Sequence, residues 1–224
     1  MQISFDTQAG RIILFQHPQS SVKETLREEC TIALGLSSRR GMGEAEMETP
    51  NGRAEIVELF GNPANSDGTV NEAWEGANIR KVAPPDGWQL FYQEDTKLTR
   101  ISGIRMHRLL EDSFVAVLDD VWDFAKKQLG DGASDDAIRD WLHKRRLDQT
   151  AGGFNFRKIT AGKSLSLHSF GIAIDWDADH NPRGKPMKKT LPDWWYDIWK
   201  AHGWSDGRHF PTPDPMHVQF ATGA

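Results

Sequence analysis

Three stretches of the sequence repeat their apolar residues at the three- and four-residue intervals of an amphipathic helix. The first spans residues 114–125 and is expected to end at Gly130. The second begins after Ser134, a residue type that caps helices. The third spans residues 192–202, with Thr190 as a candidate cap. The side chains predicted to face inward include Phe114, Val117, Leu118, Val121, Ala125, Ile138, Trp141, Leu142, Trp195, Ile198 and Trp199.

Two segments near the C-terminus alternate bulky apolar residues with small or polar ones, as β-strands do. In residues 171–176 one face is apolar, and the other holds two very small residues followed by Asp175. In residues 214–220 one face is again apolar, and the other presents His217 and Gln219. The two strands can therefore each direct a polar side chain away from the core.

The predicted strands and helices do not alternate regularly. A further strand is expected at residues 98–106, and two helices follow it before the strand at residues 171–176. A doubly wound parallel sheet requires regular alternation of strands and helices. The sequence therefore favours an α+β domain.

The first part of the chain differs in character from the rest. Residues 3–15 are expected to form a hairpin, and a helix over residues 22–34 follows the capping-box spacing of Ser21 and Glu24. A segment rich in Gly, Ser and charged residues comes next, which is typical of a linker. We divide the chain into an N-terminal extension, residues 1–50, and a main domain, residues 51–224.

Composition excludes several classes of protein. The chain has 224 residues, 38% of them hydrophobic, and a mean hydropathy of −0.59, as in a soluble globular protein without a membrane span. Its net charge of −5 and mixed charge pattern do not suit a nucleic-acid partner. The lone Cys30 excludes an internal disulfide and a zinc site built on several thiolates. We expect a monomer.

Residues His168, Asp175 and His217 are candidate metal ligands. Two imidazoles and one carboxylate from separate elements make a three-ligand zinc site, and the fourth position stays open for water, as in catalytic zinc sites. Other histidines compete for this role. They are His180, His202 and His209.

A calcium site is a competing interpretation of residues 175–186. Asp175, Asp177 and Asp179 open like an EF-hand loop, but the sixth position is histidine instead of glycine, and the twelfth is proline instead of glutamate. A calcium sensor is therefore rejected.

Asp214 lies three residues before His217 and is the candidate catalytic base. Zinc lowers the pKa of a bound water and polarises a carbonyl, and a carboxylate beside the open position can take the proton and return it to the leaving amine. The alternative is that Asp214 only starts a turn before Pro215.

These residues resemble a known family, the zinc peptidoglycan peptidases that include D-Ala-D-Ala carboxypeptidases and phage-type L-alanyl-D-glutamate endopeptidases. The resemblance is carried by Ser166-x-His168-x-x-Gly171-x-Ala173-x-Asp175 and by Asp214-x-x-His217. It implies a small hedgehog/DD-peptidase-like fold with an antiparallel sheet flanked by helices. It also implies zinc binding by the two histidines and Asp175, and an acidic base at position 214.

Further roles follow only from the resemblance. The segment Gly152-Gly153-Phe154-Asn155-Phe156-Arg157 resembles the family segment whose arginine approaches the substrate, so Arg157 is expected to bind a carboxylate or the developing oxyanion. Ser166 is expected to contact the substrate. Carboxypeptidase members usually have Glu where this chain has Asp214, whereas endolysin-like members often have Asp. The expected bond is therefore L-Ala-D-Glu, with D-Ala-D-Ala as the alternative.

The resulting hypothesis is a zinc metallopeptidase, a hydrolase that degrades the cell wall at peptidoglycan stem peptides. The alternative from another class is a non-catalytic zinc-containing module that binds the wall or has a structural role. The N-terminal residues lack the basic start and apolar core of a secretory signal. We therefore expect synthesis in the cytoplasm and action on the wall after release or delivery.

Overall fold

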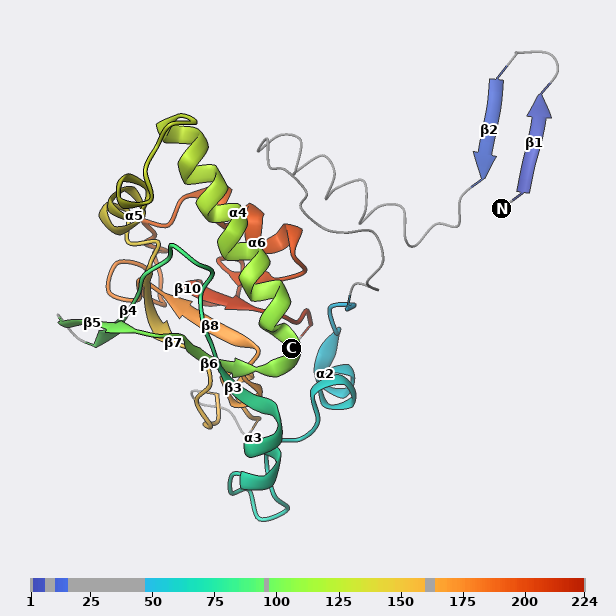
Figure 1. Cartoon of the computed structure of the whole chain (residues 1–224). Helices are drawn as coiled ribbons and strands as arrows, with labels where there is room; N and C mark the ends of the chain where they lie inside the picture. Colours follow the sequence, from blue (N-terminus) through green and yellow to red (C-terminus); the bar gives the residue numbers. More distant parts are fainter. Residues whose placement is uncertain (1, 7–10, 16–46, 95–96, 160–163, 224) are drawn as a thin grey trace.

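The computed structural model describes residues 2–6, 11–15, 47–94, 97–159 and 164–223 (Figure 1). Strands β1 (Gln2–Asp6) and β2 (Arg11–Phe15) pair in antiparallel fashion, which confirms the predicted N-terminal hairpin. The predicted helix over residues 22–34 and most of the predicted linker lie outside the described residues. The division of the chain after residue 50 stays a prediction.

The centre of the molecule is a six-stranded mixed sheet. In spatial order its strands are β5 (Lys97–Ile101), β4 (Leu90–Glu94), β7 (Gln149–Gly152), β8 (Ala173–Trp176), β10 (Asp214–Gln219) and β9 (Ser205–Gly207). Neighbouring strands are antiparallel except β4 and β7, which are parallel. The fold class is α+β as predicted, and the sheet departs from the expected antiparallel pairing only between β4 and β7.

The strand expected at residues 98–106 is two strands in two different sheets. Strand β5 is an edge of the large sheet, whereas β6 (Ile104–His107) pairs with β3 (Ile79–Val82) in a separate antiparallel ribbon. Gly103 lies at the break. A Cβ there would come within 2.3 Å of the Val82 carbonyl oxygen, so only glycine allows these two segments of the backbone to approach each other so closely.

The three helices predicted from periodicity are present, and two helices that were not predicted precede them in the main domain. The helices are α2 (Gly52–Phe60), α3 (Glu72–Asn78), α4 (Glu111–Leu129), α5 (Asp135–Lys144) and α6 (Asp193–Ala201), with short 3-10 turns η1 (Arg108–Leu110) and η2 (Leu167–Phe170). Ser134 caps α5 as predicted, accepting a hydrogen bond from the backbone of Ala137. Thr190 does not cap α6, because its hydroxyl donates instead to the carboxylate of Asp177.

An aromatic core fixes the direction of the strands that carry the candidate site. Trp176 of β8 contacts Trp195 and Trp199 of α6, and all three are almost fully buried. Successive side chains of a strand point to opposite faces. Burying Trp176 therefore turns its neighbour Asp175 away from α6. No helix among the described residues is long and apolar enough to cross a membrane.

Candidate metal centre

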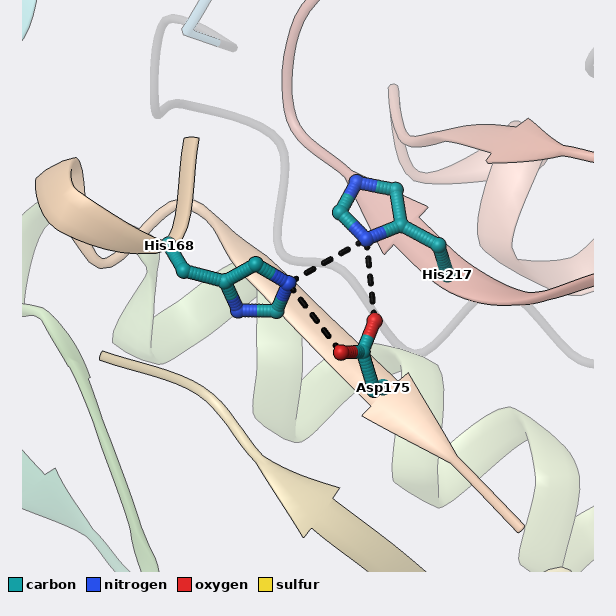
Figure 2. Close-up of side chains that lie close together, drawn as sticks. All are labelled: His168, Asp175 and His217. Atoms are coloured by element: carbon teal, nitrogen blue, oxygen red, sulfur yellow. Dashed lines mark hydrogen bonds and ion pairs between the residues drawn. The ribbon is translucent and has the colours of Figure 1, made fainter. Parts of the chain in front are cut away.

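His168, Asp175 and His217 meet at one point although they come from three different elements (Figure 2). His168 lies in η2, Asp175 in β8 and His217 in β10, where it is directly opposite Asp175 in the antiparallel register. His168 Nε2 is 3.2 Å from Asp175 Oδ2, and His217 Nδ1 is 2.9 Å from Asp175 Oδ1. The two ring nitrogens are 3.2 Å apart. The structure thus brings together all three predicted ligands.

A glycine lets the chain turn from η2 into β8. Gly171 has a left-handed conformation with φ of 67°, and a Cβ there would lie 2.7 Å from both the backbone nitrogen of His107 and Ile79 Cδ1. Any larger residue would meet both the backbone penalty and this collision. The glycine therefore allows the chain to turn between His168 and Asp175 at this close approach to His107.

Ser166 is placed to support His168. It is 5% exposed and is the N-cap of η2, where its Oγ accepts a hydrogen bond from the His168 backbone at 3.4 Å. Its expected contact with substrate stays a prediction. The ring of His168 is held from the other side, since Nδ1 lies 2.7 Å from the carbonyl oxygen of Gly153. Nδ1 must donate its proton there, so the lone pair on Nε2 is directed at the cluster.

The charges of the cluster suit a bound cation. Burial raises the pKa of Asp175, but the hydrogen bonds and charges of His168 and His217 outweigh burial and hold this pKa well below its usual range. Burial lowers the pKa of His217, and Asp175 reverses this and raises it. A carboxylate that stays ionised beside two ring nitrogens is a donor set that zinc prefers. The chain's own residues therefore fit this metal.

Asp214 lies at the start of β10 and is mostly buried, with 15% of its side chain exposed. Its Oδ1 is buried and has no hydrogen-bond partner among the described residues. Burial raises the pKa of Asp214; the charge of Asp175 also raises it, while His217 and Arg183 lower it. A carboxylate with a raised pKa and a free acceptor oxygen is suited to proton transfer.

Arg183 is a neighbour of Asp214 that the sequence did not reveal. Its Nε lies 3.9 Å from Asp214 Oδ2, and its side chain is half exposed. The loop that carries it is fixed by a hydrogen bond from the Gly184 backbone to the Pro213 carbonyl. No local pattern predicts this contact, because it joins a loop and a strand that are far apart in the sequence.

The backbone beside Asp214 is anchored by a tyrosine from α6. The buried Tyr196 hydroxyl donates a 2.6 Å hydrogen bond to the carbonyl of Pro215. Arg208 lies over the tyrosine ring at 3.9 Å and pairs with the buried carboxylate of Asp206. These contacts hold the first residues of β10 against α6.

Replacing Tyr196 with Phe removes this anchor and little else. We expect the free energy of unfolding to fall by about 1–3 kcal/mol, because the Pro215 carbonyl stays buried without its donor. With Asp214 in its predicted role as the base, the rate of turnover should also fall, by as much as ~100-fold, since a small displacement of a base weakens proton transfer. Zinc content should not change. Chemical denaturation, metal analysis and rate measurements test this, and an unchanged rate would show that the anchor does not position Asp214.

A cavity of about 340 Å³ opens beside the cluster. His168 and Asp175 form part of its wall, and so does Arg157, whose side chain is exposed. The backbone nitrogen of Arg157 donates to Ser169 Oγ at 2.8 Å, which fixes this arginine to the turn that carries His168. The other walls come from Tyr92, Ile101, Gly103, Ile104, Arg105, Ala151, Gly152, Gly153, Phe154 and Asn155. Asp214 and Ser166 are not part of its wall.

The competing histidines are placed elsewhere. His180 Nδ1 bonds Asp177 at 2.7 Å, and His202 Nε2 bonds Asp120 at 2.7 Å, whereas His209 is exposed. Within the described part of the chain, the only group of histidine, cysteine and acidic residues close enough to share a metal is the His168, Asp175 and His217 cluster.

The contacts of Asp177, the second acidic residue of the EF-hand-like segment, also argue against a calcium site. Arg146 Nε lies 2.9 Å from Asp177 Oδ2, and Asn181 and Thr190 donate to the same oxygen. Protein groups thus already occupy this carboxylate oxygen, and one of them, Arg146, supplies a positive charge.

Comparison with known families adds one finding. A model of the D-alanyl-D-alanine carboxypeptidase family matches residues 160–220. The matched segment is about a quarter of the chain and includes His168, Asp175, Asp214 and His217, but not Arg157. The match supports a hydrolase related to the peptidoglycan peptidases, which are generally zinc-dependent. No curated protein and no solved structure matches the chain.

Proposed function

We propose that this protein is a zinc-dependent peptidase that hydrolyses an amide bond in the stem peptides of peptidoglycan. The observation that carries the proposal is the convergence of two imidazole nitrogens and one carboxylate within 3.2 Å of one another, beside a cavity that has an arginine in its wall. Zinc held there would polarise the scissile carbonyl and acidify water. The family match over residues 160–220 supports the same chemistry.

The protein side of the mechanism has two parts. Asp214 accepts a proton from the attacking water and returns it to the nitrogen of the leaving amine, for which its raised pKa is suited. Arg157, on the wall of the cavity, binds a substrate carboxylate or the oxyanion that develops on the scissile carbonyl. His168, Asp175 and His217 hold the metal, and no nucleophilic side chain is required.

Two bonds are candidates, and different observations favour them. The aspartate at position 214 favours L-Ala-D-Glu, as in endolysin-like peptidases. The family match favours D-Ala-D-Ala, through the description of that family. Incubation with a synthetic stem pentapeptide distinguishes them. Release of L-Ala supports the first, release of the terminal D-Ala supports the second, and an intact peptide would count against both.

Replacing Arg157 with Lys tests the substrate-binding role. Lysine keeps the charge but not the planar pair of donors, so we expect kcat/KM to fall by about 10- to 100-fold, with unfolding behaviour and zinc content unchanged. Arg80→Lys, at an exposed position of β3, is the matched control and should match the wild type. An Arg157→Lys rate equal to that of the control would remove Arg157 from the site.

A non-catalytic zinc module is the competing function. It has no need for a carboxylate with a raised pKa and an unpartnered buried oxygen near the metal position, as Asp214 has. Failure of zinc-loaded protein to cleave stem peptides or intact walls of varied composition, together with retained binding to those walls, would favour this alternative.

A further inference from the structure

Gln219 contacts the ring of His217 on the side away from the proposed metal position. It lies two residues farther along β10, so its side chain is on the same face of the strand. Gln219 Oε1 is 3.0 Å from His217 Nε2, while His217 Nδ1 faces Asp175 and His168. Both residues are buried, with 5% and 8% exposed surface. Water is thus a poor substitute for this contact.

The orientation of the Gln219 amide is fixed by its second contact. Its Nε2 donates to the carbonyl oxygen of Ala221 at 3.1 Å, and that carbonyl can only accept. A flipped amide would place its oxygen against the Ala221 carbonyl oxygen, and neither oxygen can donate. Ser205 Oγ also donates to the Ala221 carbonyl at 2.6 Å, which holds the acceptor in place. Gln219 therefore presents oxygen, and not nitrogen, to His217.

An oxygen at that position determines which ring nitrogen of His217 carries a proton. The amide oxygen accepts only from an N–H, so Nε2 is protonated and the lone pair of the neutral ring is on Nδ1. In His168 the roles of the two ring nitrogens are exchanged. Its Nδ1 donates to the Gly153 carbonyl, and its Nε2 faces the cluster. Two different acceptors thus direct two lone pairs to one point.

We propose that Gln219 is a positioning residue that keeps the proton of His217 on Nε2 and so directs Nδ1 at the metal. This inference rests on the proposed metal-binding role of His168, Asp175 and His217. Partners of this kind typically change metal affinity by 10- to 100-fold. They act through the ligand, because they do not touch the metal.

The test compares Gln219→Met with the wild type and with Gln93→Met in the full-length protein. Methionine has a similar length but cannot replace the amide as an acceptor for His217. Gln93 is also a buried glutamine, and its amide donates to Asp179, outside the cluster. Competition with a chromogenic zinc chelator should show a Kd for zinc raised 10- to 100-fold in Gln219→Met and within about twofold of wild type in Gln93→Met. Gln219→Glu keeps an acceptor oxygen for His217 but loses the N–H donated to Ala221, so it should recover part of the affinity.

A second measurement does not depend on the folding of the variants. In the 15N NMR spectrum of zinc-loaded wild type, His217 should carry the metal on Nδ1 and a slowly exchanging proton on Nε2. A spectrum with zinc on Nε2 overturns the inference, and so does wild-type affinity in Gln219→Met. If the wild type binds no zinc at these three residues, the proposed function itself fails.

Discussion

Replacing Asp214 with Asn is expected to lower the rate of stem-peptide hydrolysis by roughly two to four orders of magnitude, the usual contribution of a positioned general base. Asparagine keeps the shape of the side chain and its preference for turns, so it can still begin β10 before Pro215. It cannot accept the proton. Zinc content and the free energy of unfolding should therefore stay close to those of the wild type.

The comparison needs a control for the general effect of an Asp-to-Asn change. Asp86, an exposed residue in the turn before β4, is suitable, and Asp86→Asn should have wild-type activity. Release of new amino groups from peptidoglycan, measured at matched zinc occupancy, gives the rates. If Asp214→Asn is as active as Asp86→Asn, Asp214 only begins the strand and the base is another group.

Replacing His217 with Ala is expected to abolish both zinc binding and hydrolysis. The substitution removes one of three ligands and leaves the carboxylate of Asp175 without its 2.9 Å partner. The loss of zinc affinity should exceed the 10- to 100-fold change expected for a residue that only supports a ligand. Metal analysis after dialysis should give about one zinc per chain for the wild type and close to none for the variant.

His209→Ala is the matched control for the ligand substitution. His209 is exposed and lies outside the cluster, so its removal should change neither zinc content nor rate. Circular dichroism should show that both variants remain folded. A folded His217→Ala protein that keeps its zinc would place the metal site elsewhere.

The sequence predicted the proximity of His168, Asp175 and His217 better than it predicted the order of the strands, and the reason is physical. Asp175 and His217 each lie on the polar face of a strand whose other face is apolar, and burial of that apolar face determines where the polar side chains point. The antiparallel register then places the two residues opposite each other. Alternation along each strand predicts the face on which each residue lies, whereas the register that sets the two residues opposite each other is seen only in the structure.

Long-range contacts were not predictable in the same way. The break between β5 and β6 depends on the approach of Gly103 to Val82, and the parallel pairing of β4 with β7 depends on the path of two helices between them. The sequence placed Gln219 on the face of His217, but its role depends on the distance to the ring and on the Ala221 carbonyl. Such details arise only when separate segments pack together.

The most direct test of zinc-dependent peptidase activity is digestion of purified peptidoglycan by the full-length protein, followed by identification of the new chain ends by mass spectrometry. Three samples are needed: zinc-loaded protein, protein stripped with a chelator, and stripped protein to which zinc has been returned. We predict new amino and carboxyl ends at a single stem-peptide bond in the first and third samples and none in the second. Cleavage that is equal in all three samples, or absent from all three, would contradict the assignment of a zinc-dependent stem-peptide hydrolase.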